Sequence, residues 1–135
     1  MLKINNRLNF YLILINIIFL LYYSLQLLIY TDEFAINNLG FFNHAVAGLS
    51  EIVGIIFITF VIAYIIIMFR GIEKQLPFIF LIFIFQVLVS LNFWRYVFTN
   101  SPGETSLNII ATNAIFFSIL SILNLFFIFR NFKKI

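Results

Sequence analysis

The sequence contains no cysteine, one histidine and two prolines, and only 10% of its 135 residues are charged. The lack of cysteine excludes disulfide bonds, thiolate nucleophiles, C-x-x-C redox pairs and cysteine-ligated metals or clusters. A single histidine excludes a haem held by two histidines of one chain. The sequence also lacks a glycine-rich phosphate loop, a paired-carboxylate signature and an H-E-x-x-H motif. We therefore predict no metal site, no cofactor and no catalytic residues, and expect a protein that is not an enzyme.

The sequence is rich in hydrophobic residues, which form long apolar stretches. Hydrophobic residues make up 64% of the chain, whereas soluble domains use about half. A helix needs roughly 20 apolar residues to cross a bilayer, and strict period-two alternation is missing. The pattern predicts an all-α integral membrane protein, a four-helix bundle that occupies residues 1–135 as a single domain. The predicted spans are Leu8–Tyr30, Ala45–Phe69, Pro77–Phe98 and Leu107–Phe129.

The basic residues gather on one side of the predicted membrane. Seven of the eight lie before the first span, between the second and third, or after the fourth: Lys3, Arg7, Arg70, Lys74, Arg130, Lys133 and Lys134. Since cytoplasmic segments carry the excess of lysine and arginine, both termini are predicted to face the cytoplasm, in a bacterial inner membrane. Because these charges are dispersed at membrane ends, they do not indicate nucleic-acid binding.

The segment between the first two spans is the longest connection. It runs from Thr31 to His44 and has acidic but no basic residues. We expect an interfacial turn of helix in it, with Phe34, Ile36, Phe41 and Phe42 dipping into the headgroups. Asn43 is placed to cap the second span.

Two charged residues, Glu51 and Arg95, lie within predicted spans. At 1.5 Å per residue, Glu51 lies roughly 9 Å below the outer boundary and the Arg95 backbone about 4–5 Å below it. Because a charge in a membrane helix costs about 2.5–3.5 kcal/mol, each charge is expected to have a partner. One hypothesis makes Glu51–Arg95 a structural clasp. The other makes it the floor of an outward-facing pocket, in which Glu51 binds a proton, a cation or a polar head.

Other polar residues share the depth of this pair. They complete a candidate polar site and come from all four spans: Ser24, Gln26, Asn92 and Asn113, with His44 on the same helical face as Glu51. We interpret His44 as an interfacial residue, because no second metal ligand is near it in sequence. Gln86 and Ser90 point away from Arg95, which indicates a different neighbour or a second subunit. A strip of small residues for close helix packing is formed by Ala47, Ser50 and Gly54.

In layout the chain resembles the DoxX-like group of small four-helix bacterial membrane proteins. The features that carry the resemblance are the length, the four spans with both ends inside, and a longer first outer loop that ends near Leu39 and Gly40. Two short motifs add to it, "NHAVAGLSEIVG" at the head of the second span and "NFWRYVFTNSPG" at the outer end of the third. The resemblance implies a compact bundle with an accessory role in the envelope, and it supplies no catalytic residues.

Three functions remain open on this basis. The leading hypothesis is a non-enzymatic accessory protein or subunit, whose partners besides the lipid bilayer are other membrane helices or further copies of the chain. The alternative is a binder of small molecules or lipids, or a proton-linked transporter, that works through the polar site around Glu51. A membrane enzyme acting on lipid or quinone is the third reading.

Overall fold

The computed structural model describes residue 4, residues 6–99 and residues 106–132. Three of the basic residues from which the orientation is predicted lie outside this part of the chain, namely Lys3, Lys133 and Lys134. The described residues form five helices, of which four are long and apolar enough to cross a membrane. The helices are α1 (Arg7–Leu28), α2 (Thr31–Leu39), α3 (His44–Arg70), α4 (Leu76–Thr99) and α5 (Leu107–Asn131).

The bounds of the four long helices differ from the predicted spans by at most two residues. Local signals explain where they begin. The Asn6 side chain accepts hydrogen bonds from the first turn of α1, and the Asn43 side chain accepts one of 2.8 Å from the Val46 amide, as the sequence predicts for a helix cap. Gly40 ends α2 with a φ of 77°, a left-handed conformation that glycine adopts without strain.

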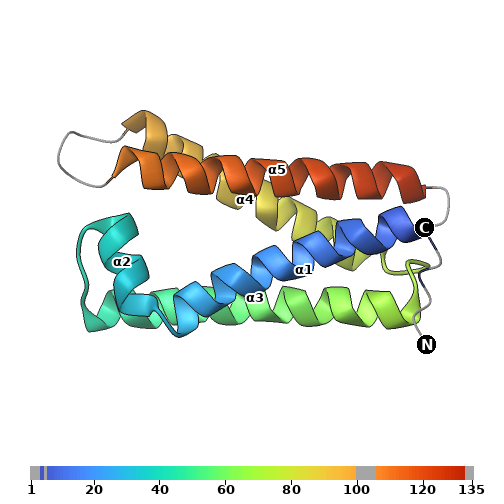
Figure 1. Ribbon diagram of the computed structural model, residues 1–135, viewed down its shortest axis with the longest axis horizontal. Helices are drawn as coiled ribbons and strands as arrows, with labels where there is room; N and C mark the ends of the chain where they lie inside the picture. Colours follow the sequence, from blue (N-terminus) through green and yellow to red (C-terminus); the bar gives the residue numbers. More distant parts are fainter. Residues whose placement is uncertain (1–3, 5, 100–105, 133–135) are drawn as a thin grey trace.

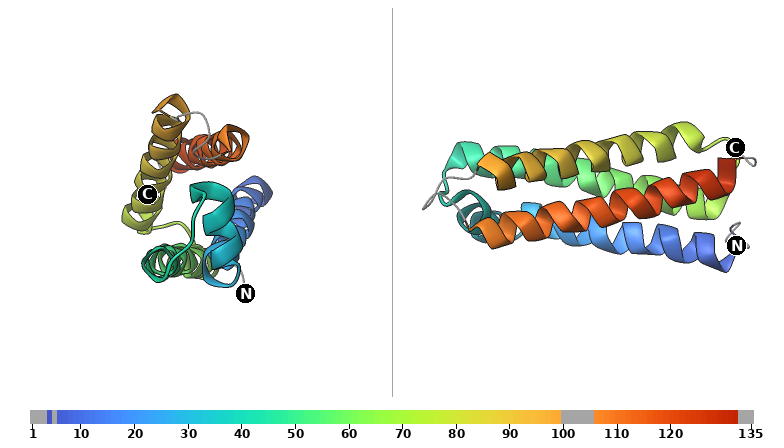
Figure 2. Two further views of the ribbon diagram at one scale, coloured as in Figure 1. Left: turned by 90° about the vertical axis from the view of Figure 1, so that its left-hand side faces the viewer. Right: turned by 90° about the horizontal axis from the view of Figure 1, so that it is seen from above.

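The four long helices pack as two pairs. α1 lies along α3, and α4 lies along α5, whereas contact between the pairs is sparser (Figure 1). α1 begins and α5 ends at one end of the bundle, the termini end, and α2 lies across the opposite end, the α2 end, as Figure 2 also shows. The predicted all-helical bundle of four apolar spans is therefore present, with α2 as a fifth helix.

Large apolar side chains fill the space between the helices. Tyr64, Phe117, Phe127 and Leu20 are among the residues with almost no exposed surface. The outward faces are also apolar, because leucine, isoleucine and phenylalanine side chains remain exposed along every long helix. An apolar exterior of this extent is stable in lipid rather than in water. The protein is thus a small multi-pass membrane protein.

Candidate functional site

The structure does not bring together the two charges that the sequence singles out. Glu51 on α3 and Arg95 on α4 are both exposed, and no ion pair joins them. The Arg95 guanidinium instead lies over the ring of Tyr96, with its central carbon 4.8 Å from the ring centroid. Similar depth does not imply contact, because the two side chains leave their helices on faces that do not meet.

The remaining members of the predicted polar site are divided between the surface and the interior. His44 begins α3 and is exposed, and Asn92 is exposed on α4. Gln26 is half-buried, in a small pocket that it shares with the buried Asn113. The site is therefore not one slab of inward-facing polar groups.

Ser24 of α1 and Gly54 of α3 lie where these two helices pack tightly against each other. The buried Ser24 hydroxyl donates a 3.1 Å hydrogen bond to the Gly54 carbonyl oxygen. A Cβ atom on Gly54 would stand 2.7 Å from Cγ of Leu28. The other two residues of the small-residue strip, Ala47 and Ser50, are half-buried, and Ser50 borders a pocket between α3 and α4.

A chain of hydrogen bonds ties α2 to the α2 end of the bundle. The Tyr23 hydroxyl donates to the Asn113 side-chain oxygen, and the Asn113 amide donates over 2.6 Å to the side chain of Asn38. Asn38 in turn donates to the Phe34 carbonyl oxygen within α2. These bonds join α1, α5 and α2, so the short helix is attached through its polar face. Phe34 consequently packs inward, half-buried, and not into the headgroups as expected.

Gln86 and Ser90 have a different neighbour within the chain, which is one of the two alternatives that their helical phase left open. Gln86 is fully buried and donates over 2.8 Å to the side-chain oxygen of Asn16 on α1. It also accepts a 3.2 Å hydrogen bond from Asn124 on α5. The Ser90 and Ser118 hydroxyl oxygens lie 2.8 Å apart between α4 and α5. Both residues are therefore satisfied inside this chain.

Tyr64 completes the layer around Gln86. Its buried hydroxyl, from α3, faces Asn124 without reaching hydrogen-bonding geometry. The Asn124 side-chain oxygen likewise has no hydrogen-bond partner in the described part of the chain. The four long helices thus each contribute one buried polar side chain at this level: Asn16, Tyr64, Gln86 and Asn124.

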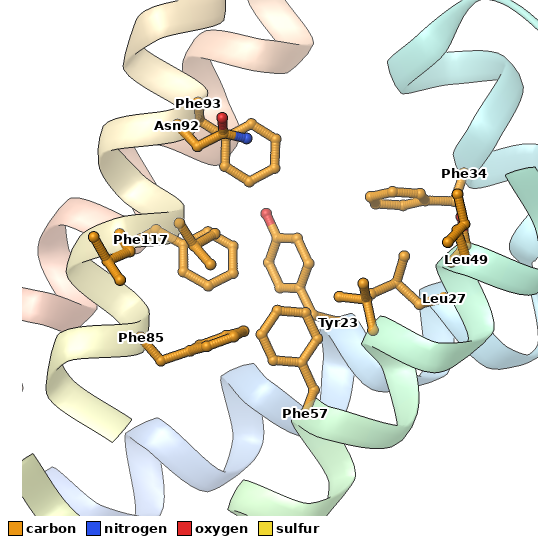
Figure 3. A pocket seen from close by; sticks show the side chains of 13 residues that line it. Tyr23, Leu27, Phe34, Leu49, Phe57, Phe85, Asn92, Phe93 and Phe117 are labelled. Carbon is orange, nitrogen blue, oxygen red and sulfur yellow. The ribbon is translucent and has the colours of Figure 1, made fainter. Parts of the chain in front are cut away.

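A pocket of about 520 Å³, named the α3–α4 pocket, lies between the two helix pairs. Leu49 of α3 and Leu88 of α4 line it and are both well exposed, so the pocket reaches the outer surface of the bundle. Its polar groups come from Ser50, Asn92 and Tyr23. Of the residues that the structure describes, six aromatic ones line it, namely Tyr23, Phe34, Phe57, Phe85, Phe93 and Phe117, and no charged one does (Figure 3).

Five of the aromatic rings that line the α3–α4 pocket contact one another and form one wall, namely those of Tyr23, Phe57, Phe85, Phe93 and Phe117. Phe117 at its centre stacks with Phe57 on one side and Phe93 on the other, at interplanar angles of 25° and 22°. The Tyr23 ring stands in the middle of the pocket with its centroid 4.9 Å from that of Phe117 (Figure 3). Pockets that bind small molecules typically combine such an apolar wall with a few polar groups.

A second pocket, of about 790 Å³, lies at the α2 end and is named the α2–α4 pocket. It shares three lining residues with the first, so the two pockets adjoin: Phe34, Asn92 and Phe93. Its other lining residues include Asn38, Phe41, Tyr96 and Thr99. Among the described residues, no group of three or more histidine, aspartate or glutamate side chains is placed to hold a metal ion.

Comparisons with protein-family models, curated proteins and solved structures found no match for this chain. The resemblance to DoxX-like proteins therefore stays a prediction.

Sequence reasoning missed the residues that carry most of the polar contacts. Asn9, Asn16 and Tyr23 recur every seven residues along α1, and Asn124 and Asn131 have the same spacing on α5. Residues seven apart share a helix face, so this period marks the buried face of both helices. At the termini end, the buried Asn9 and Asn131 side chains hydrogen-bond to each other over 2.8 Å and 3.3 Å.

Proposed function

We propose that this protein is a non-enzymatic membrane protein that holds a lipid-like apolar ligand in the α3–α4 pocket. The proposal places it in the bacterial cytoplasmic membrane with both termini inside, as the distribution of basic residues predicts. The observation that carries it is the aromatic pocket itself, which adjoins the bilayer between α3 and α4.

The lining of the pocket selects for an uncharged, largely apolar guest. None of the lining residues in the described part of the chain is ionisable at neutral pH, and the polar groups within reach are the hydroxyls of Tyr23 and Ser50 and the Asn92 amide. Burying a charge there without a partner would be costly, whereas an acyl chain loses little on leaving the bilayer. Glu51 is exposed and does not line this pocket, so the proposal does not depend on it.

A role as a subunit of a larger assembly was favoured by the phenylalanine-rich outer faces of the helices and by the face that carries Gln86 and Ser90. The outer faces remain exposed, but the second observation no longer supports that role. Gln86 and Ser90 are both buried within this chain and bonded to Asn16 and Ser118. Ligand binding is the function that the geometry supports better.

The test uses phospholipid with a photoactivatable diazirine in its acyl chain. The full-length protein is reconstituted into vesicles of this lipid, illuminated and digested, and adducts are mapped by mass spectrometry. Phe57 and Phe117 are at most 3% exposed, so bulk lipid at the protein surface does not reach them. Adducts on these two residues, in addition to exposed residues such as Ile62, are expected if a chain occupies the pocket.

A matched pair of variants shows whether those adducts come from the pocket. Val89→Trp places a large ring in the lining and is expected to reduce adducts on Phe57 and Phe117 to background. Leu91→Trp adds the same ring to the same helix at an exposed position outside the lining and is expected to leave them unchanged. Adducts confined to exposed residues in the unaltered protein would contradict the proposal.

A further inference from the structure

The α2–α4 pocket extends the α3–α4 pocket toward the end of the bundle. Asn92 and Phe93 line both, and the α2–α4 pocket continues along α4 to Thr99. At 1.5 Å per residue, the stretch from Asn92 to Thr99 covers about 10 Å at the end of a membrane-spanning helix. Thr99 lies at the predicted outer boundary of the membrane and Asn92 about 10 Å below it, so the α2–α4 pocket reaches the headgroup layer at its Thr99 end, whereas the α3–α4 pocket lies deeper, at the level of the acyl chains.

The α2–α4 pocket combines aromatic faces with uncharged polar groups. Phe34, Phe41, Phe93 and Tyr96 contribute four rings to its lining, and among the described residues that line it there is no carboxylate or basic side chain. Aromatic faces carry partial negative charge and attract ammonium groups. The ring of Tyr96 already has the Arg95 guanidinium over one face, so a cation is accommodated at the edge of this pocket.

Two helices end at this pocket, and both ends have the same polarity. α2 ends at Leu39, next to the lining residue Gly40, and α4 ends at the lining residue Thr99. The C-terminal end of a helix carries partial negative charge and favours cations. The helix ends and the aromatic rings therefore favour the same ligand group, an ammonium.

We infer that the occupant is a zwitterionic phospholipid, with its ammonium group in the α2–α4 pocket and an acyl chain in the α3–α4 pocket. Arg95 is exposed and its guanidinium lies over the Tyr96 ring at the edge of this pocket, where its N–H groups are donors that a phosphate accepts. Along α4, the lining residues Phe85, Leu88 and Val89 of the α3–α4 pocket are followed by Arg95 and then by Tyr96 and Thr99 of the α2–α4 pocket. This is the order of acyl chain, phosphate and ammonium in such a lipid. This inference rests on the proposed function and adds the class of headgroup.

The experiment compares headgroups on one photoactivatable acyl chain. The full-length protein is reconstituted in vesicles that contain a small, equal fraction of the diazirine lipid with an ethanolamine, a choline or a glycerol headgroup. Adducts on the buried Phe57 and Phe117 report occupancy of the α3–α4 pocket. We expect about fivefold more of these adducts with the two ammonium headgroups than with glycerol, the size of one solvent-exposed contact between an ammonium and an aromatic ring.

Two variants locate the source of that selectivity. Phe41→Leu removes a ring from the α2–α4 pocket and is expected to bring the three lipids closer to equal yield. Phe42→Leu removes the neighbouring exposed ring, which does not line the pocket, and is expected to preserve the preference. The comparison of headgroups in the unaltered protein needs neither variant to fold.

The outcomes separate the two proposals. Equal yields for all three headgroups, with adducts that Val89→Trp still removes, would overturn the headgroup assignment and leave lipid binding in place. A preference for glycerol would overturn it as well. Failure to find adducts on Phe57 and Phe117 with any headgroup would overturn the proposed function and, with it, this inference.

Discussion

The Gln86 side-chain amide donates a hydrogen bond to the Asn16 side-chain oxygen over 2.8 Å, and this bond joins the two helix pairs inside the bundle. The two residues are 70 positions apart in the sequence, and both have almost no exposed surface. Inside a bilayer, neither group has water as an alternative partner. The bond therefore specifies how the α1–α3 pair sits against the α4–α5 pair.

Replacing Gln86 by leucine is expected to lower the free energy of unfolding by about 1–2 kcal/mol, because Asn16 and Asn124 each lose a buried partner. Unfolding in mixed micelles with increasing denaturing detergent measures the change. Asn16→Leu combined with Gln86→Leu is expected to cost less than the sum of the single changes.

Thr59→Val is the control for this series. Thr59 is exposed and bonds only to the Ile55 carbonyl of its own helix, so its loss is expected to change stability by less than about 0.5 kcal/mol. Strict additivity of the two leucine substitutions would show that Asn16 and Gln86 are not coupled.

Loss of the hydroxyl group is expected to change the stability of the fold in opposite directions at two buried tyrosines. Tyr23→Phe leaves Asn113 without its donor and is expected to destabilise the fold by about 1 kcal/mol. Tyr64→Phe removes a buried hydroxyl that has no hydrogen-bond partner, and is expected to be neutral or to stabilise by up to about 1 kcal/mol. The same unfolding measurement compares them. Destabilisation by Tyr64→Phe would mean that this hydroxyl does bond, with Asn124 as its neighbour.

Replacement by alanine is likewise expected to change the stability of the fold in opposite directions at two glycines of α3. Gly48→Ala adds a methyl group where no atom lies within 4 Å, so it is expected to stabilise the helix by up to about 1 kcal/mol. Gly54→Ala places Cβ 2.7 Å from Cγ of Leu28 and 3.1 Å from Cβ of Leu27. Overpacking of this kind costs about 1–3 kcal/mol, which outweighs the gain in helix propensity. Equal stability of the two variants would show that α1 is free to move away from Gly54.

The orientation is tested with single cysteines, since the chain has none of its own. Asp32→Cys at the α2 end and Glu73→Cys at the termini end each replace an exposed acidic residue. In intact cells, a membrane-impermeant maleimide is expected to label position 32 and not position 73, because the excess of basic residues predicts that the termini are inside. After the membrane is permeabilised, both positions are expected to react. Labelling of position 73 alone in intact cells would reverse the orientation.

The sequence alone determined the number of long helices and their ends. Crossing a bilayer requires an unbroken apolar stretch of a certain length, and that property is local and can be counted residue by residue. The cap at Asn43 is equally local, because its side chain bonds within the next turn. The depth of a residue along its helix follows from the same count, which is why the sequence places Glu51 and Arg95 near one end of their spans.

Only the tertiary structure decided which way each helix is rotated. In a soluble protein the polar face of a helix is known from its amphipathic pattern, but a span such as α3 is apolar on nearly every side. Its rotation is then set by packing and by the few polar side chains that must find partners on other helices. In the folded chain Gln86 pairs with Asn16, and Tyr23 with Asn113, while Glu51 and Arg95 remain on separate outer faces. Phe34 is turned inward and closes the aromatic lining of the pocket, because the amide chain from Asn113 to Asn38 holds α2 against the bundle.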